Sequence, residues 1–379
     1  MNDADGTVIG KTKWYSHEWS PMPNPRNGIR RTGAILATVA AFLLSGCAVT
    51  DVQGEASAGG YEPYLPEVVS DDAGLREDFE STPQESHDFW SDPSKMEDAE
   101  GMEFQSPDNS LPPGPGDPAT GAYLPATETM PSKPNGYGTV ADAEVFDRAG
   151  LGASTFGRLY FTFDGQMLNV CSATVVNSKS GSIVVTAAHC VVSTDGTGTL
   201  AESMIFVPGD RNDAQEQPHG MWAAVSVAVP QQFVDGAITD EEGYLLSQEG
   251  WNYDYAFLKM EEKDGQTIQE AAGAQGIAFG IPVETLTQIG YPSAAPYDGR
   301  EEYMCASTSF TSNWQGGYTH DCTMTQGASG GGWLANYDSA SGTGYVVGVT
   351  SSIAMGSRDT NSPVLGQTAL NIYNELDGS

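Results

Sequence analysis

Basic residues are scarce in this chain of 379 residues, which holds 16 Lys and Arg against 50 Asp and Glu. The formal net charge of −34 argues against a nucleic-acid partner, because phosphate binding needs a basic stripe. It also argues against electrostatic docking on anionic lipid. No apolar run reaches the roughly 18 residues that a transmembrane helix needs, so we expect no spanning helix.

The first 46 residues are typical of an export signal. Arginines precede an apolar run from Ala34 to Leu44, which is too short to cross a membrane. The run ends in Leu44-Ser45-Gly46-Cys47, which resembles the lipobox of bacterial lipoproteins, where the cysteine is acylated and becomes the new N-terminus. We therefore predict a lipoprotein signal peptide over 1–46 and a lipid on Cys47. An ordinary secretory signal with a chance cysteine is the alternative, and Met22 is an alternative start.

Only four cysteines remain besides Cys47, and four cysteines allow three pairings. Pairing of sequence neighbours gives Cys171–Cys190 and Cys305–Cys322. Each bond would close a loop of about 20 residues and stabilise the fold by roughly 3 kcal/mol. Export places these cysteines in an oxidising compartment, where disulfides persist.

Residues 47–140 differ in composition from the rest of the chain. From Ala48 to Val140, 19 Asp and Glu stand against three Lys and Arg, and Pro, Ser and Gly are frequent. Such a segment cannot bury enough apolar surface to offset the entropy of ordering, so we predict a disordered, self-repelling acidic tether. Small aromatic islands, such as the one around Trp90, leave a folded or inhibitory prosegment as the alternative.

Residues 141–379 have the pattern of an all-β domain. Short β-rich runs recur between turn signals, as in a sandwich or barrel. The runs cover 159–163, 170–176, 183–186, 204–207, 222–229, 255–258, 285–289, 303–308 and 345–351. We also expect a short helix near 268–274 and a C-terminal helix that starts at Ser362 as N-cap, with Pro363 in its first turn, and ends near Leu376.

Three local clusters carry residues suited to catalysis. His189 follows the apolar run 183–186 beside Cys190, which would hold a general base rigidly. Asp254 enters an apolar strand, where a carboxylate is costly unless it accepts hydrogen bonds. Ser329 lies among glycines that let the backbone bend and point its amides at one place, as an oxyanion hole requires.

The order His, Asp, Ser is that of the best known catalytic triad. With the block Cys322-Thr-Met-Thr-Gln-Gly-Ala-Ser-Gly-Gly331, the domain resembles the trypsin-like (chymotrypsin-fold) serine peptidases, and most the secreted bacterial branch. The resemblance implies two antiparallel six-stranded β-barrels with the triad in their cleft. It implies that His189 is the base, that Asp254 orients it, and that Ser329 is the nucleophile. The amides of Gly327 and Ser329 would form the oxyanion hole.

The resemblance also implies substrate-binding residues. Ser351, in Gly348-Val-Thr-Ser351, would lie near Asp254 on the strand that pairs with the substrate backbone. Thr323 would lie at the base of the side-chain pocket, where no carboxylate is available to pair a cation. The sequence departs from the family pattern at Ala328, where animal members carry Asp, and at Gly332, where Pro is usual.

We therefore predict a serine-type endopeptidase that is lipid-anchored at the outer face of a bacterial cell membrane, with a shed or secreted form as the alternative. Its partners would be protein or peptide substrates and the membrane, with no nucleic acid, no metal and no organic cofactor, and we expect a monomer. A catalytically inactive surface binding protein of the same fold is the alternative. His219 and His320 are expected to be exposed loop residues.

Overall fold

The computed structural model describes residues 64–65, 74–102, 104–106, 116–211, 216–240, 242–246, 250–312 and 316–379. The signal segment and Cys47 lie outside the described residues, so the predictions made for them stay predictions. None of the helices in the described ranges is long and apolar enough to cross a membrane.

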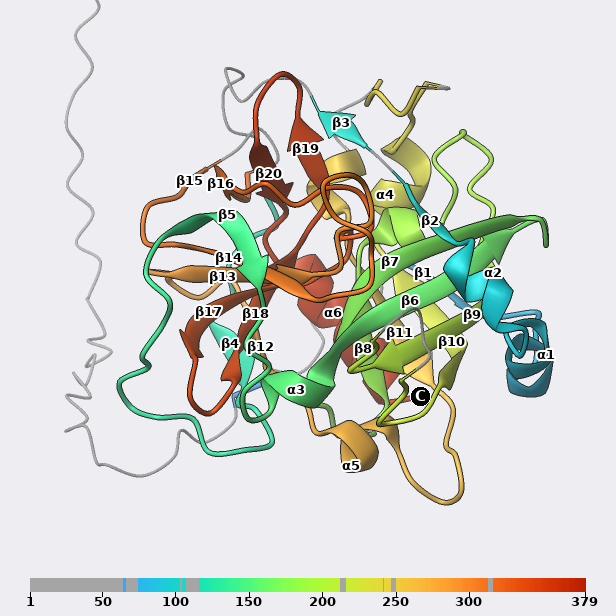
Figure 1. The fold of residues 1–379 in the computed structure, drawn as a ribbon, viewed down its shortest axis with the longest axis horizontal. Helices are drawn as coiled ribbons and strands as arrows, with labels where there is room; N and C mark the ends of the chain where they lie inside the picture. The colour runs from blue at the N-terminus through green and yellow to red at the C-terminus, as the bar shows by residue number, and fades with distance from the viewer. Residues whose placement is uncertain are drawn as a thin grey trace, which may run out of the picture. The chain divides into compact units, whose positions relative to one another are not determined.

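Six strands close into a barrel in the first half of the domain. Their order is β10-β11-β8-β7-β6-β9, and antiparallel pairing of β9 with β10 completes the ring. In Figure 1 they lie on the right, in green and yellow. They match predicted β-rich runs, and their interior is filled by valines, phenylalanines and leucines. The strands are β6 (Phe156–Phe163), β7 (Met167–Val175), β8 (Ile183–Thr186), β9 (Glu202–Pro208), β10 (Trp222–Val229) and β11 (Ala256–Met260).

The second half of the domain forms two further sheets, drawn mainly in orange and red in Figure 1. The seven-stranded sheet has the order β4-β12-β18-β17-β13-β14-β5 and the five-stranded sheet the order β15-β16-β20-β19-β3. The expected all-β, chymotrypsin-like architecture is confirmed. Of the two six-stranded barrels expected, the first is closed, and the described strands of the second half are divided between these two sheets. The strands are β3 (Gln105–Ser106), β4 (Ala122–Leu124), β5 (Val140–Val145), β12 (Gly276–Phe279), β13 (Leu286–Gly290), β14 (Tyr303–Ser307), β15 (Thr311–Ser312), β16 (Tyr318–Asp321), β17 (Gly332–Asp338), β18 (Thr343–Val349), β19 (Ser352–Ala354) and β20 (Asp359–Ser362).

The C-terminal helix α6 (Gln367–Asp377) joins the two halves. The ring of Tyr373 lies 5.5 Å from that of Phe257 on β11 and 5.5 Å from that of Phe279 on β12. The helix begins later than the sequence suggested, because Ser362 belongs to β20 and Gly366 is the N-cap. The other helices of the domain are short: α3 (Gly152–Thr155), α4 (Gln231–Gly236) and α5 (Ile268–Ala272), with 3₁₀ turns at Ala188–Cys190 and Gly250–Tyr253.

The N-cap residue Gly366 has no side chain to cap α6, and the carboxylate of Asp117 takes this role. It accepts backbone N–H groups of Gly366, Thr368 and Ala369 at 2.9, 2.9 and 3.1 Å. It also accepts the hydroxyl of Tyr255 at 2.8 Å. A buried carboxylate is thereby fully hydrogen-bonded, and it satisfies amide groups that a helix leaves free at its start.

The described part of the segment 47–140 is folded, which corrects the expectation of a disordered tether for these residues. Strand β1 (Leu75–Asp78) pairs with β10, β2 (Glu100–Gly101) pairs with β7, and β4 pairs with β12. Two short helices, α1 (Pro83–Phe89) and α2 (Pro93–Glu97), lie beside β9 in Figure 1. The aromatic islands explain the difference, because Trp90 is buried with its ring 5.5 Å from that of Tyr160.

Both expected disulfides are present. Cys171–Cys190 connects β7 to the 3₁₀ turn that carries His189, and Cys305–Cys322 connects β14 to the residue after β16. The first bond therefore fixes the histidine to the barrel wall, and the second fixes the segment that leads to Ser329.

Candidate active site

The His189 imidazole is held by Asp254 from two directions. Its Nδ1 lies 2.8 Å from Asp254 Oδ2, and its backbone N–H donates to Asp254 Oδ1 at 3.0 Å. Both side chains are buried. A carboxylate bound to Nδ1 orients the ring and leaves Nε2 for proton transfer. The structure thus brings together the first two residues of the predicted triad.

Asp254 accepts a third hydrogen bond, from the hydroxyl of Ser351 at 2.6 Å. The buried carboxylate is therefore saturated with donors, which meets the physical requirement inferred from the sequence. Ser351 was expected near Asp254, and the structure places it there. Its hydroxyl points at the carboxylate, so its side chain supports the histidine partner.

Ser329 lies on a tight loop that packs against the barrel end beside His189. The carbonyl of Ser329 accepts the amide of Ser172 on β7 at 2.7 Å. A Cβ on Gly330 would lie 2.1 Å from Thr186 Oγ1, so only glycine allows this approach to the strand that precedes His189. The amide of Gly330 donates to the carbonyl of Thr350 at 2.8 Å, which fixes the loop to the second half.

The amides of Gly327 and Ser329 are candidates for an oxyanion hole. Neither donates a hydrogen bond to another residue in the described part of the chain. Gly327 has a φ of +92°, a conformation that favours glycine. Its carbonyl accepts the hydroxyl of Ser172 at 2.8 Å, which fixes the loop to β7. Donors fixed in this way can stabilise a developing negative charge.

A small cavity of about 10 Å³ lies beside Ser329, and Met102 and Phe104 form part of its wall. The sequence argument missed both residues, because they belong to the acidic segment; the aromatic character of Phe104 within that segment was the available signal. The pocket is otherwise lined by Met324, Thr325, Gln326, Ala328, Ser329, Thr350, Ser351, Ser352, Ile353 and Thr360.

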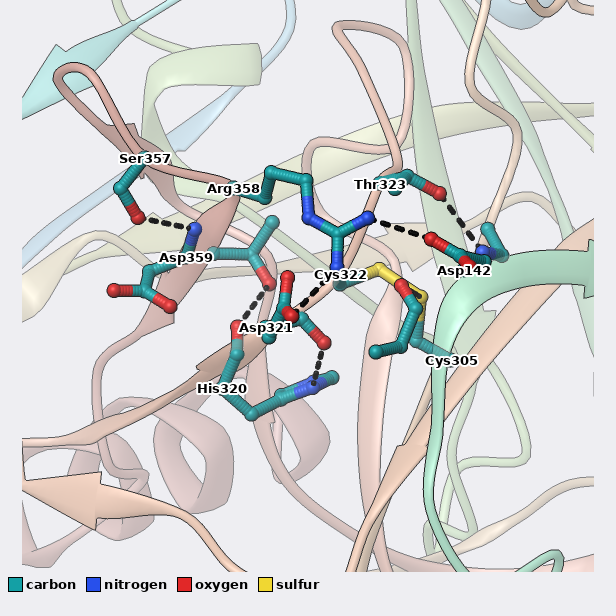
Figure 2. A network of polar contacts seen from close by, with 12 residues as sticks. Asp142, Cys305, His320, Asp321, Cys322, Thr323, Ser357, Arg358 and Asp359 are labelled. Carbon is teal, nitrogen blue, oxygen red and sulfur yellow. Dashed lines mark hydrogen bonds and ion pairs between the residues drawn. A yellow bond between two sulfur atoms is a disulfide. The ribbon is translucent and has the colours of Figure 1, made fainter.

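Thr323 does not line this pocket. Its hydroxyl accepts the amide of Ala143 at 2.8 Å and lies 2.6 Å from the hydroxyl of Tyr297. Figure 2 shows it turned toward the Asp142 side of the network. Met324, one position later, supplies the pocket wall instead. The prediction of Thr323 as a substrate-binding residue stays a prediction.

Arg358 forms an ion pair with Asp321, the acidic residue nearest in sequence to the residues that line the cavity. Its guanidinium lies 2.6 Å from carboxylate oxygens of both Asp142 and Asp321 (Figure 2). Hydrogen bonds that the guanidinium donates to Asp321 and Asp142 raise the pKa of Arg358, so the side chain stays charged. Asp321 is thus half-exposed and paired, and it does not lie among the described residues of the pocket wall.

His320 is buried on β16, which corrects the expectation of an exposed loop residue. Its ring lies 4.6 Å from that of Trp333, and Nδ1 lies 3.1 Å from the carbonyl of Asp321. Burial lowers the pKa of His320 to about 4. The side chain is therefore neutral at physiological pH.

The only cluster of possible metal ligands in the described ranges is Cys171, His189 and Cys190. The two sulfur atoms are bonded to each other, so they offer no thiolate to a metal ion. The cluster reflects the packing of the disulfide against the histidine.

Comparison with known proteins agrees with this geometry. Residues 171–349 match the sequence model of the trypsin-like peptidase domain. No curated protein sequence matches the chain. The solved structure of the protease Anisep from Arthrobacter nicotinovorans is similar at 29% identity and a TM-score of 0.50, over 61% of this chain and 99% of that one. The thermostable serine protease AL20 from an extremophilic microorganism has 29% identity and a TM-score of 0.49, over 60% of this chain and 99% of that one.

The matched range contains His189, Asp254 and Ser329, and the described strands around them form the expected barrel and sheets. The domain that carries these residues belongs to the trypsin-like serine peptidases.

Proposed function

We propose that the protein is a serine endopeptidase in which Ser329, His189 and Asp254 form the catalytic triad. The observation that carries this proposal is the pair of hydrogen bonds that joins His189 to Asp254 beside the loop of Ser329. The two candidate oxyanion amides of this loop, those of Gly327 and Ser329, are unpaired within the described residues. The family supports a serine peptidase in general, and the positions of these residues support the assignment of roles.

In this mechanism Ser329 Oγ attacks the carbonyl carbon of the scissile peptide bond while His189 Nε2 takes its proton. Asp254 stabilises the imidazolium, and the amides of Gly327 and Ser329 bind the negatively charged oxygen of the tetrahedral intermediate. His189 then gives the proton to the leaving amine. A water molecule, activated by the same histidine, hydrolyses the acyl-enzyme.

The pocket walls favour an uncharged side chain before the scissile bond. Thr325, Thr350, Ser352 and Thr360 contribute hydroxyl groups and Met324 an apolar surface. The described lining residues hold no carboxylate, and Arg358 already pairs Asp321. A substrate Arg or Lys would lose its hydration without gaining a charged partner, so cleavage after these residues should be disfavoured.

Substitution of Ser329 tests the triad. Since Phe104 packs on His189 and lines the cavity beside Ser329, hydrolysis is compared in Phe104→Ala and in the double variant Phe104→Ala/Ser329→Ala, on a protein substrate whose fragments are identified by mass spectrometry. We expect internal cleavage products from the first and a loss of at least a thousandfold in rate for the second, with an unchanged thermal midpoint.

Residual hydrolysis by the double variant would show that the nucleophile is another residue. Absence of both hydrolysis and fluorophosphonate labelling in Phe104→Ala would favour the inactive binding protein. Release of terminal residues alone would contradict the endopeptidase assignment.

We also place the enzyme at the outer face of a bacterial cell membrane through a lipid on Cys47. The proposal is supported by the sequence Leu44-Ser45-Gly46-Cys47 after an apolar run. The net charge of −34 disfavours direct binding to anionic lipid, so the lipid on Cys47 would supply the attachment.

A further inference from the structure

The described residues 100–102 and 104–106, which we call the cleft segment, run through the candidate active site. Gly101 lies directly against the loop that carries Gly327 and Ser329, because a Cβ at position 101 would be 2.3 Å from the amide nitrogen of Gly327. Met102 and Phe104 line the cavity that Ser329 borders, and only about 10 Å³ of it is open. The segment therefore covers the places where a substrate carbonyl and its side chain would bind.

Phe104 also covers the histidine. Its ring centroid lies 4.5 Å from that of His189 and 5.2 Å from that of Trp251, and only 8% of the residue is exposed. The Nε2 atom of His189 is buried and has no hydrogen-bond partner among the described residues. The atom that must take the proton of Ser329 is thus closed off by an aromatic ring, which can neither give nor take that proton.

The direction of the cleft segment is opposite to that of a substrate. Strand β3 pairs with β19 in parallel, with Gln105 opposite Ile353 and Ser106 opposite Ala354. The amide of Ile353 donates to the carbonyl of Phe104 at 3.1 Å. The acyl half of a substrate would pair with β19 and end at Ser329, which lies next to the start of β19. Such a substrate must therefore run antiparallel to β19. The cleft segment runs parallel to β19 and fills the same hydrogen-bonding edge. It therefore does not present a peptide bond to Ser329 in the orientation needed for cleavage.

The segment is also held from its other side. The amide of Gln105 donates to the carbonyl of Gly243 at 3.1 Å, and the carbonyl of Gln105 accepts the amide of Leu245 at 3.2 Å. Ser106 is fully buried, and its hydroxyl accepts Asn361 Nδ2 at 2.9 Å. Main-chain pairing on both edges is the arrangement expected of a bound peptide and gives affinity that depends little on side chains.

We propose that the cleft segment is an intramolecular inhibitor of the peptidase, bound in reverse across the acyl-binding edge β19 and the pocket beside Ser329. The inference rests on the proposed function, since an inhibitor requires a competent site beneath it. The inhibition involves no covalent step. The full chain is then latent, and activity requires displacement of Phe104 and Gln105 from the cleft.

The test measures the rate at which a small fluorophosphonate modifies Ser329 in the full chain, together with hydrolysis of a peptide substrate. Phe104→Ala removes the ring from the pocket, and Gln105→Pro removes the amide that bonds to Gly243. Phe89→Ala is the matched control, because Phe89 is an aromatic residue of the same N-terminal region that packs on Trp90 away from the cleft. Thermal midpoints confirm that each variant is folded.

We expect Phe104→Ala and Gln105→Pro to increase the labelling rate and kcat/KM by at least tenfold over the wild type, and Phe89→Ala to leave both unchanged. We also expect the wild-type chain to remain uncut between residues 100 and 106 during long incubation, as judged by intact mass. Equal labelling of all four proteins would overturn the inhibitor while leaving the proposed function in place. Self-cleavage within the segment would show that it binds as a substrate, and absence of labelling in every protein would overturn both proposals.

Discussion

The buried imidazole of His320 links the stability of the fold to pH. The ring packs on Trp333 of β17, and its Nδ1 lies 3.1 Å from the carbonyl of Asp321. Burial opposes protonation of the ring and lowers its pKa from 6.5 to about 4. The unfolded chain therefore binds a proton in this range that the folded chain does not.

Replacement of His320 by Phe should make the protein less sensitive to acid. The stability associated with the neutral histidine is present above pH 6.5, the pKa in the unfolded chain, and is lost as the pH falls toward 4. The loss should amount to roughly 3 kcal/mol at most, and phenylalanine, which takes up no proton, avoids it.

Urea unfolding of the wild type and His320→Phe between pH 7 and 4 measures this effect. The loss in free energy of unfolding should be smaller in the variant than in the wild type. Parallel pH profiles for wild type and His320→Phe would show that His320 takes up its proton in the folded state.

Single residues differ in how far their surroundings could be predicted from the sequence. Asp254 needed donors because it enters an apolar strand, and it has three, from the amide and ring of His189 and the hydroxyl of Ser351. That requirement is local. The burial of His320 depends on how strands distant in the sequence pair and pack, and there the prediction was wrong.

Among the secondary-structure elements, helix α6 shows the limit of reading local signals. Ser362 and Pro363 are typical of a helix start, yet Ser362 pairs in β20, opposite Tyr318. The true cap is Asp117, which is about 250 residues away in the sequence. Strand β8 was predicted well because its four residues are all β-branched, and β10 because valines recur along it after Trp222. A cap supplied from a distant segment leaves no pattern near the helix.

Removal of the Asp117 side chain should destabilise α6 and the junction between the two halves. Asp117→Ala leaves the amides of Gly366, Thr368 and Ala369 without acceptors and removes the partner of the Tyr255 hydroxyl. We expect a loss of about 2 to 4 kcal/mol in the free energy of unfolding, with faster hydrogen exchange in α6.

Asp92→Ala is the matched control, because Asp92 caps the short exposed helix α2 through the amide of Ser94. Its cost should stay below about 1 kcal/mol. If Asp117→Ala costs no more than this control, α6 does not depend on the distant carboxylate.

On the scale of the whole molecule, composition indicated the fold class but not the extent of the folded domain. The acidic, proline-rich stretch 47–140 was expected to be a tether, whereas β1, α1, α2, β2, β3 and β4 lie within it. Strands in this stretch gain their stability by pairing with the barrel or sheets, as β1 does with β10. The average composition of a segment does not reveal whether its residues can be buried against strands from another part of the chain. The folded alternative therefore applies to the described residues.

Cys47→Ala should release the protein from the membrane fraction without changing the catalytic domain. The proposed anchor is a lipid on this cysteine, and the acidic composition disfavours attraction to anionic lipid. Fractionation of cells that express the wild type and the variant measures the distribution. A variant that stays with the membrane would indicate an uncleaved signal or a protein receptor, and Cys171–Cys190 should form normally in both.

The most direct measurement of the central claim is the site at which a fluorophosphonate attaches to the Phe104→Ala protein, determined by peptide mass spectrometry. Our account predicts one adduct, on Ser329, formed rapidly because His189 and Asp254 activate its hydroxyl. The adduct should be lost in Phe104→Ala/Ser329→Ala and formed much more slowly in Phe104→Ala/His189→Ala. An adduct on another residue, or labelling of Ser329 at the same rate without His189, would contradict the proposed catalytic triad.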